Sequence, residues 1–224
     1  MNPLAFLEKL MAKSCCDHPP STDTLAVSTS PRYRRVLWLA LWVNLAMFVV
    51  EIGAGLTSGS VSLLADAIDF FGDAANYGVT LVVLSMGALW RTRAAMLKAA
   101  SMIAFGIFVL ARAAWVFQQG NTPEALTMGA IGSLALLANV GVAVMLYTWR
   151  DGDANMRSVW LCSRNDAMGN IAVMLAALGV FGTGSAWPDL LVAGVMGGLA
   201  LHSGWQVLGQ SRQEMAGHRA TPHA

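Results

Sequence analysis

Two pairs of residues with metal-binding side chains stand out in the sequence because each pair is spaced four residues apart inside an apolar stretch. Asp69 and Asp73 form the first pair, and Cys162 and Asp166 form the second. On an α-helix, residues at this spacing lie on one face, one turn apart. Three carboxylates and one thiolate suit the tetrahedral coordination of a borderline-soft divalent cation such as Zn²⁺. The spacing therefore predicts a metal site wherever the two helices face each other.

The same residues also have a purely structural interpretation. Asp69 and Asp73 could hydrogen-bond neighbouring helices, and Cys162 could be a small buried apolar side chain. A charged side chain in the middle of a bilayer costs ~2.5–3.5 kcal/mol or more, whereas Ser, Thr and Asn form such hydrogen bonds without that cost. The cost favours the metal site over the structural interpretation.

Composition indicates that the elements positioning these residues are membrane-spanning helices. The chain is 56% hydrophobic and only 12% charged, with a mean hydropathy of +0.55. A soluble domain is about 25% charged, so the composition argues against a soluble enzyme, a nucleic-acid-binding protein and a disordered chain. Apolar stretches of at least the ~20 residues that span a bilayer cover 36–58, 60–87, 95–118, 125–149, 156–181 and 187–208. We therefore expect an all-α, multi-pass membrane protein with six transmembrane helices, and no enzyme.

The basic residues determine the expected orientation. Lys and Arg residues lie in the segment before the first span, in or beside the 2–3 and 4–5 loops, and in the segment after the sixth span. The other three loops contain neither residue. The positive-inside rule then places both termini in the cytoplasm, which requires an even number of spans. We expect a largely flexible cytoplasmic tail over 1–35, a transmembrane domain over 36–209 and a short cytoplasmic tail over 210–224. The expected location is the bacterial inner (plasma) membrane.

This orientation brings the two ligand pairs to one depth. At ~1.5 Å per residue, Asp69 and Asp73 lie ~14–20 Å below the outer surface, and Cys162 and Asp166 lie ~9–15 Å above the inner surface. Both intervals fall near the midplane. Asn165 is placed to act as a further ligand or as a packing residue.

A second polar layer is expected nearer the outside. Glu51 and Asp66 stand at similar distances on either side of the turn near residue 58, and Asn44 shares the helical stripe of Glu51. Two interpretations stay open: an acidic pair on the exit path of the metal, or a structural network with Arg112.

The amino-terminal tail contains a third group of candidate ligands. Cys15, Cys16 and His18 are suited to capture a soft metal on the cytoplasmic side. The alternative is a pair of reduced cysteines in a flexible tail.

The segments SVSLLADAIDFFGDAANY (60–77) and SVWLCSRNDAMGN (158–170) resemble the cation diffusion facilitator family, helped by FVVEIGAGLTSGSVSLLAD (48–66) and WPDLLVAG (187–194). The resemblance implies six spans, cytoplasmic termini and a metal site on spans two and five, which falls on Asp69, Asp73, Cys162 and Asp166. Cys162 departs from the His or Asp usual in the family, which puts the metal preference in doubt and favours Zn²⁺ or Cd²⁺. The chain also lacks room for the carboxy-terminal cytoplasmic domain common in the family, so it resembles a truncated branch.

The resemblance further implies efflux of a divalent metal from the cytoplasm in exchange for protons, by alternating access, with no cofactor and no nucleic acid partner. Two other functions remain as alternatives: a non-transporting metal sensor or accessory protein, and a proton-coupled organic-cation exporter with tryptophan walls. A homodimer would have to form through transmembrane helices, at Gly194 and Gly198 or at Gly129 and Ser133. Packing within one chain explains these small residues equally well.

Overall fold

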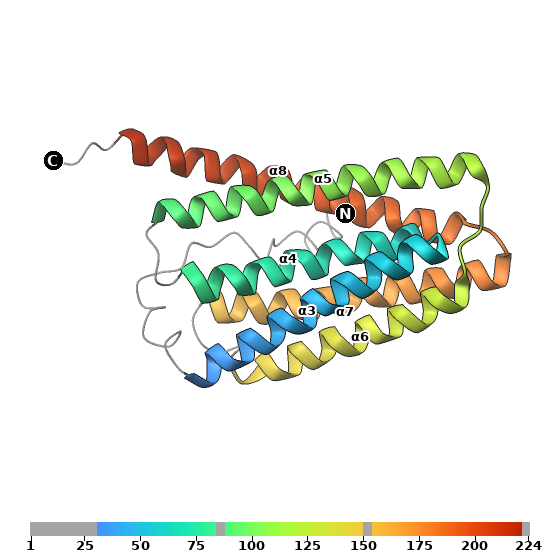
Figure 1. Ribbon diagram of the computed structural model, residues 1–224, viewed down its shortest axis with the longest axis horizontal. Coiled ribbons are helices and arrows are strands. Elements are labelled where there is room, and N and C mark those ends of the chain that lie inside the picture. Colours follow the sequence, from blue (N-terminus) through green and yellow to red (C-terminus); the bar gives the residue numbers. More distant parts are fainter. Residues whose placement is uncertain (1–30, 84–87, 150–153, 221–224) are drawn as a thin grey trace, which may run out of the picture.

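The computed structural model describes residues 31–83, 88–149 and 154–220, with side chains at all of these positions except 82–83, 88–91, 149, 154–165, 214 and 216–220. Within these ranges the chain forms six long α-helices and one short 3₁₀ turn (Figure 1). They are α3 (Pro31–Ser58), α4 (Val61–Val83), α5 (Ala88–Gln119), α6 (Ala125–Leu146), η1 (Tyr147–Trp149), α7 (Ala154–Thr183) and α8 (Trp187–Ala220). The all-α prediction is confirmed. Five of the six helices are long and apolar enough to cross a membrane, and α4, with three aspartates, is the exception.

The helices run alternately up and down along one bundle axis (Figure 1). The beginnings of α3, α5 and α7 lie at the same end of the bundle as the final residues of α4, α6 and α8. This end corresponds to the side that the positive-inside rule assigns to the cytoplasm. The opposite end has three short connections, and each contains a glycine in the left-handed backbone conformation: Gly59, Gly120 and Gly184, with φ between 60° and 74°. Glycine adopts this conformation without a steric penalty, which explains why the helices stop there.

Several helices extend beyond the apolar stretches that predict the spans, most of all at the start of α3, at the start of α5 (Ala88 rather than residue 95) and at the end of α8. Helix α3 begins at Pro31 rather than at residue 36, because proline has a backbone angle suited to the first position of a helix and lacks the N–H that would be unpaired there. Helix α8 continues past residue 208 to Ala220. Its last turns contain Gln, Arg, Glu, Met and Ala, which favour the helix even where it is polar. The end of an apolar stretch therefore does not mark the end of the helix.

The helices pack mainly as the pairs α3–α4, α5–α8 and α6–α7, with α4 also contacting α5, α7 and α8. Small residues permit the close approach of α5 and α8: a Cβ atom at Gly204 would lie 2.7 Å from Ile103, and one at Gly106 would lie 2.9 Å from Leu201. Gly129 faces Ala177 across the α6–α7 contact. A Cβ atom at Gly194 or at Gly198 would meet no atom of another helix within 4 Å, so this face of α8 takes no part in packing among the described residues.

One carboxylate holds the outer end of α4 in place. Asp189, in the first turn of α8, is fully buried. Its Oδ2 accepts a hydrogen bond from the backbone N–H of Val61 at 2.8 Å, and its Oδ1 accepts bonds from the N–H of Ser62 at 3.0 Å and the Ser60 and Ser62 hydroxyls at 2.7 and 2.6 Å. The Ser60 hydroxyl also accepts a bond from the N–H of Leu63 at 3.2 Å. Asp189 and Ser60 thus pair three of the N–H groups that every helix start leaves without a partner, and the negative charge lies at the positive end of the helix dipole.

We predict that Asp189→Ala lowers the free energy of unfolding by about 2–4 kcal/mol, because two buried N–H groups and two hydroxyls lose their acceptor. The measurement is thermal unfolding of the detergent-solubilised protein. Glu124→Ala is the matched control, since Glu124 precedes α6 at the same end of the bundle but its side chain makes no capping hydrogen bond. Equal stability of the two variants would contradict the role of Asp189.

Candidate metal centre

Helix α4 carries an acidic stripe into the bundle. Asp69 and Asp73 lie one turn apart, Asp69 partly buried and Asp73 only 6% exposed. One further turn along, the Tyr77 hydroxyl donates a hydrogen bond to Asp73 Oδ2 at 3.2 Å. In an apolar bundle this bond stabilises the carboxylate and limits its rotation.

Helix α7 supplies the carboxyl group that faces this stripe. Asp166 lies against Asp73, with the two side chains within hydrogen-bonding range. Asp69 is near enough to interact electrostatically with Asp166. The structure therefore brings Asp73 and Asp166 together across the α4–α7 contact. The other two predicted ligands are less closely placed. Asp69 is a turn away from Asp73, and the side chain of Cys162 lies outside the described residues, as does that of Asn165.

The arrangement is not a closed metal cage. Among the side chains that the structure describes, no three from His, Cys, Asp and Glu come close enough together to hold one ion. Like charges repel one another, so bringing a third carboxylate to the Asp73–Asp166 pair would require a cation between them. Cys15, Cys16 and His18, the predicted cytoplasmic ligands, fall outside the described residues.

The sequence did not predict that a basic residue lies beside the Asp73–Asp166 pair. Lys98 of α5 is only 7% exposed and donates a hydrogen bond from Nζ to Asn76 Oδ1. Its positive charge also interacts electrostatically with Asp73. In the sequence, Lys98 is one of the basic residues that flank the predicted 2–3 loop and indicate the orientation. The predicted spans place Lys98 only three residues into the third span, whereas in the structure Asp73 lies ten residues before the end of α4 and Lys98 ten residues after the start of α5. Residues equidistant from a turn reach the same depth in an antiparallel hairpin.

The predicted outer polar layer forms a contact between Glu51 and Asp66, but Arg112 takes no part in it. Glu51 and Asp66 face each other across the α3–α4 contact within hydrogen-bonding range. Arg112 forms no ion pair with either of them in the described part of the chain, and its Nε is buried without a hydrogen-bond partner. Asn44 uses its Nδ2 to bond the Ala40 carbonyl of its own helix at 2.8 Å.

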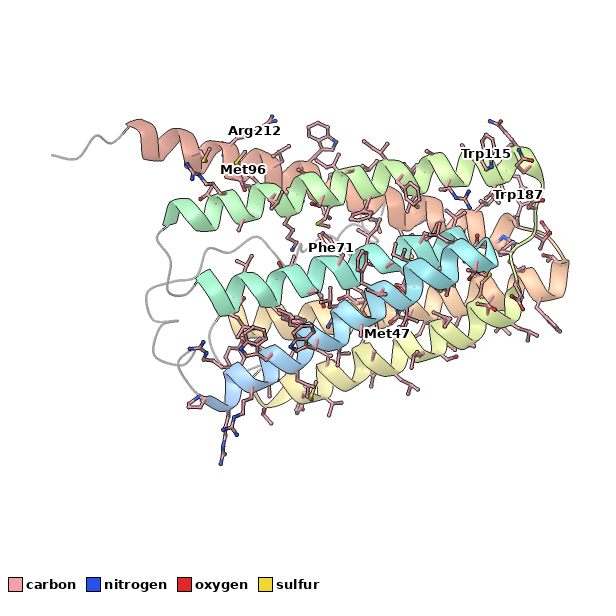
Figure 2. All side chains as sticks on the ribbon, in the orientation of Figure 1. Met47, Phe71, Met96, Trp115, Trp187 and Arg212 are labelled. Atoms are coloured by element: carbon pink, nitrogen blue, oxygen red, sulfur yellow. The ribbon has the colours of Figure 1, made fainter. Side chains whose placement is uncertain are left out.

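The aromatic side chains lie mostly at the surface and in one internal cluster. Phe71, which points from α4 toward α5 in Figure 2, packs against Phe48 and Phe105 with ring centroids 5.4–5.5 Å apart. Trp38, Trp42 and Trp115 are 44–59% exposed, as expected for residues that face lipid or its interface. Trp115 and Trp187 lie at the outer end of the bundle (Figure 2).

Comparison with known proteins agrees with this architecture. The model of the cation efflux transmembrane domain matches residues 37–216, which is most of the chain. Zinc transporter ZitB of Escherichia coli (strain K12) is 28% identical over 195 residues, covering 81% of this chain and 62% of the relative. The cadmium, cobalt and zinc/H(+)-K(+) antiporter of Bacillus subtilis (strain 168) is 24% identical over 190 residues, covering 78% and 60%. The metal cation efflux system protein CzcD of Cupriavidus metallidurans is 22% identical over 189 residues, covering 79% and 60%.

The chain spans about three fifths of the length of these relatives. The match to a transmembrane domain, the apolar helices and the bacterial relatives together identify a multi-pass protein of the inner membrane and confirm that prediction. The family consists of transporters, which agrees with the expectation that the protein is not an enzyme. The chain belongs to the cation efflux family, the cation diffusion facilitators that its span-two and span-five segments resemble.

Proposed function

We propose that the protein exports a divalent transition-metal cation, Zn²⁺ or Cd²⁺, from the cytoplasm in exchange for protons. The metal would bind at mid-membrane to Asp69, Asp73, Cys162 and Asp166, and the site would open alternately to the two sides. The observation that supports this proposal best is the juxtaposition of Asp73 and Asp166 on two different helices. Membership of the cation efflux family supports the same direction of transport.

The chemistry of the ligands explains how metal and protons exchange. A metal ion needs deprotonated carboxylate and thiolate ligands, so its binding releases protons. Two adjacent carboxyl groups in a medium of low dielectric constant retain either a cation or a proton between them. Protonation from the outer side would then displace the metal, and deprotonation on the cytoplasmic side would restore the site. The same groups thus exchange one kind of cation for the other.

Cys162 determines the expected metal preference. A thiolate is a softer ligand than a carboxylate and favours Zn²⁺ and Cd²⁺ over Mn²⁺ and Mg²⁺. The relatives whose printed names include zinc and cadmium are consistent with this preference.

Two alternatives make different predictions. An organic-cation exporter needs aromatic side chains around its cargo, whereas Trp38, Trp42 and Trp115 are exposed on the outside of the bundle. A non-transporting sensor or accessory protein would bind metal at the same residues but would move none across a membrane.

The test is metal uptake into proteoliposomes that contain a zinc indicator, with a pH indicator in a parallel set. Asp73→Asn and Asp166→Asn should each reduce both metal uptake and metal-driven proton movement more than about tenfold, because each removes a charged ligand. Glu124→Gln, the same type of change at an exposed position outside the site, should transport like the wild type. Wild-type transport by either Asn variant would refute the site, and metal binding without any uptake by the wild type would favour the sensor.

Lys98 provides a second prediction. Its ammonium group supplies a positive charge beside Asp73 that opposes the approach of a divalent cation. Lys98→Met should therefore raise the affinity for Zn²⁺ by roughly tenfold, whereas Lys98→Arg, which keeps the charge, should bind like the wild type. The measurement is competition with a fluorescent zinc chelator in detergent. Equal affinities of the Met and Arg variants would contradict an electrostatic role.

A further inference from the structure

The Glu51–Asp66 pair lies apart from the proposed metal ligands and has no assigned role. Glu51 is 0% exposed and Asp66 1% exposed, and their carboxyl groups face each other between α3 and α4. Both oxygens of Glu51 and Oδ1 of Asp66 are buried without a hydrogen-bond donor. Buried carboxylate oxygens in a bilayer are costly when nothing pairs with them, so three such atoms in one place indicate a missing ligand.

Two asparagine side chains, Asn139 and Asn170, determine which carboxylate oxygen of Asp66 lacks a hydrogen-bond donor. Asn139 Nδ2 of α6 donates to Asn170 Oδ1 of α7 at 2.9 Å, and Asn170 Nδ2 donates to Asp66 Oδ2 at 2.6 Å. Asp66 Oδ2 therefore acts as an acceptor. Asp66 Oδ1 has no donor and lies 3.9 Å from the position that a Cβ atom at Gly169 would occupy. The ligand that is missing thus belongs between Asp66 Oδ1 and Glu51.

The surrounding charges exclude a resident basic partner among the described residues. The charged groups nearest the pair are Asp69 of α4, which interacts electrostatically with Glu51, and Asp166 of α7, with which Asp66 interacts electrostatically, and both are acidic. Helix α6 contains no titratable residue, and Asp189 of α8 is engaged at the start of α4. Arg112 of α5 forms no ion pair with Glu51 or Asp66. Two adjacent carboxyl groups in this setting retain a proton between them, because like charges at contact cannot both remain buried.

We propose that Glu51 and Asp66 form a proton-binding site, separate from the metal ligands, that holds the proton used in exchange for the metal. The proposal rests on the proposed function. Asp66 is five residues from the outer start of α4, whereas Asp69 and Asp73 lie deeper, so a proton from the outer side reaches the pair first. The step is a transfer from the pair to the carboxylate of Asp69 as the metal leaves. One O–H bond breaks and one forms, and outside water then supplies the pair with a new proton.

Glu51→Gln tests this site because glutamine keeps the size of the side chain and can donate a hydrogen bond to Asp66 but cannot exchange a proton. In proteoliposomes the variant should bind Zn²⁺ within about threefold of the wild type but lose metal-driven proton movement at least tenfold. Its metal uptake should also become insensitive to the external pH. Glu124→Gln, the same chemical change at an exposed position, should retain coupling. Full proton coupling in Glu51→Gln would overturn the proposal.

Infrared spectroscopy provides a readout that does not depend on transport. The metal-free wild type at neutral pH should show the carbonyl bands of protonated carboxyl groups, and Glu51→Gln should lose the component that the Glu51–Asp66 pair contributes. A band that is unchanged in the variant would also overturn the proposal. If the wild type moves no metal but the band behaves as expected, the proposed function fails while the proton site stands. If metal moves and the band does not respond to the substitution, the proton site alone fails.

Discussion

The structure depends on the bond between Asp189 of α8 and the first turn of α4. Helix α4 contains three aspartates, and it is the one described helix whose number of charged residues keeps it from being identified as a span by composition alone. A fully buried carboxylate that binds two backbone N–H groups fixes both the height and the rotation of the helix. With the outer end held in this way, Asp66 faces α3 and α7, and Asp73 faces α7 about two turns further in.

Polar side chains then form two layers across the bundle. The inner layer contains Asp73, Asp166 and Lys98, and the outer layer contains Glu51, Asp66 and Asn170. Lipid offers no hydrogen bonds, so polar groups at this depth must find partners inside the bundle. In our account the inner layer exchanges metal for protons, and the outer layer stores the proton. In this account the negative charges serve transport, because packing alone would favour uncharged residues.

Much of this arrangement could be predicted from the sequence because bilayer thickness and loop charges constrain it strongly. The six helices, their alternation and the shared depth of Glu51 and Asp66 follow from counting residues along apolar stretches. Asp189 could not be found in this way, since its partners precede it by 127–129 residues and nothing local indicates that α8 begins beside α4. The Asn139–Asn170 bond is also long-range, because two asparagines in separate spans do not reveal which helices are neighbours. Lys98 was missed because the apolar stretch that predicts the third span begins at residue 95, whereas α5 begins at Ala88.

We propose that Cys162 joins three aspartates around the transported ion, and X-ray absorption at the zinc edge tests this coordination. We expect the Zn²⁺-loaded wild type to show one sulfur at ~2.3 Å and three oxygens at ~2.0–2.2 Å. Cys162→Ser should lose the sulfur contribution and keep the oxygen shell. A wild-type spectrum with only oxygen or nitrogen ligands, or a spectrum that Cys162→Ser leaves unchanged, would contradict the account.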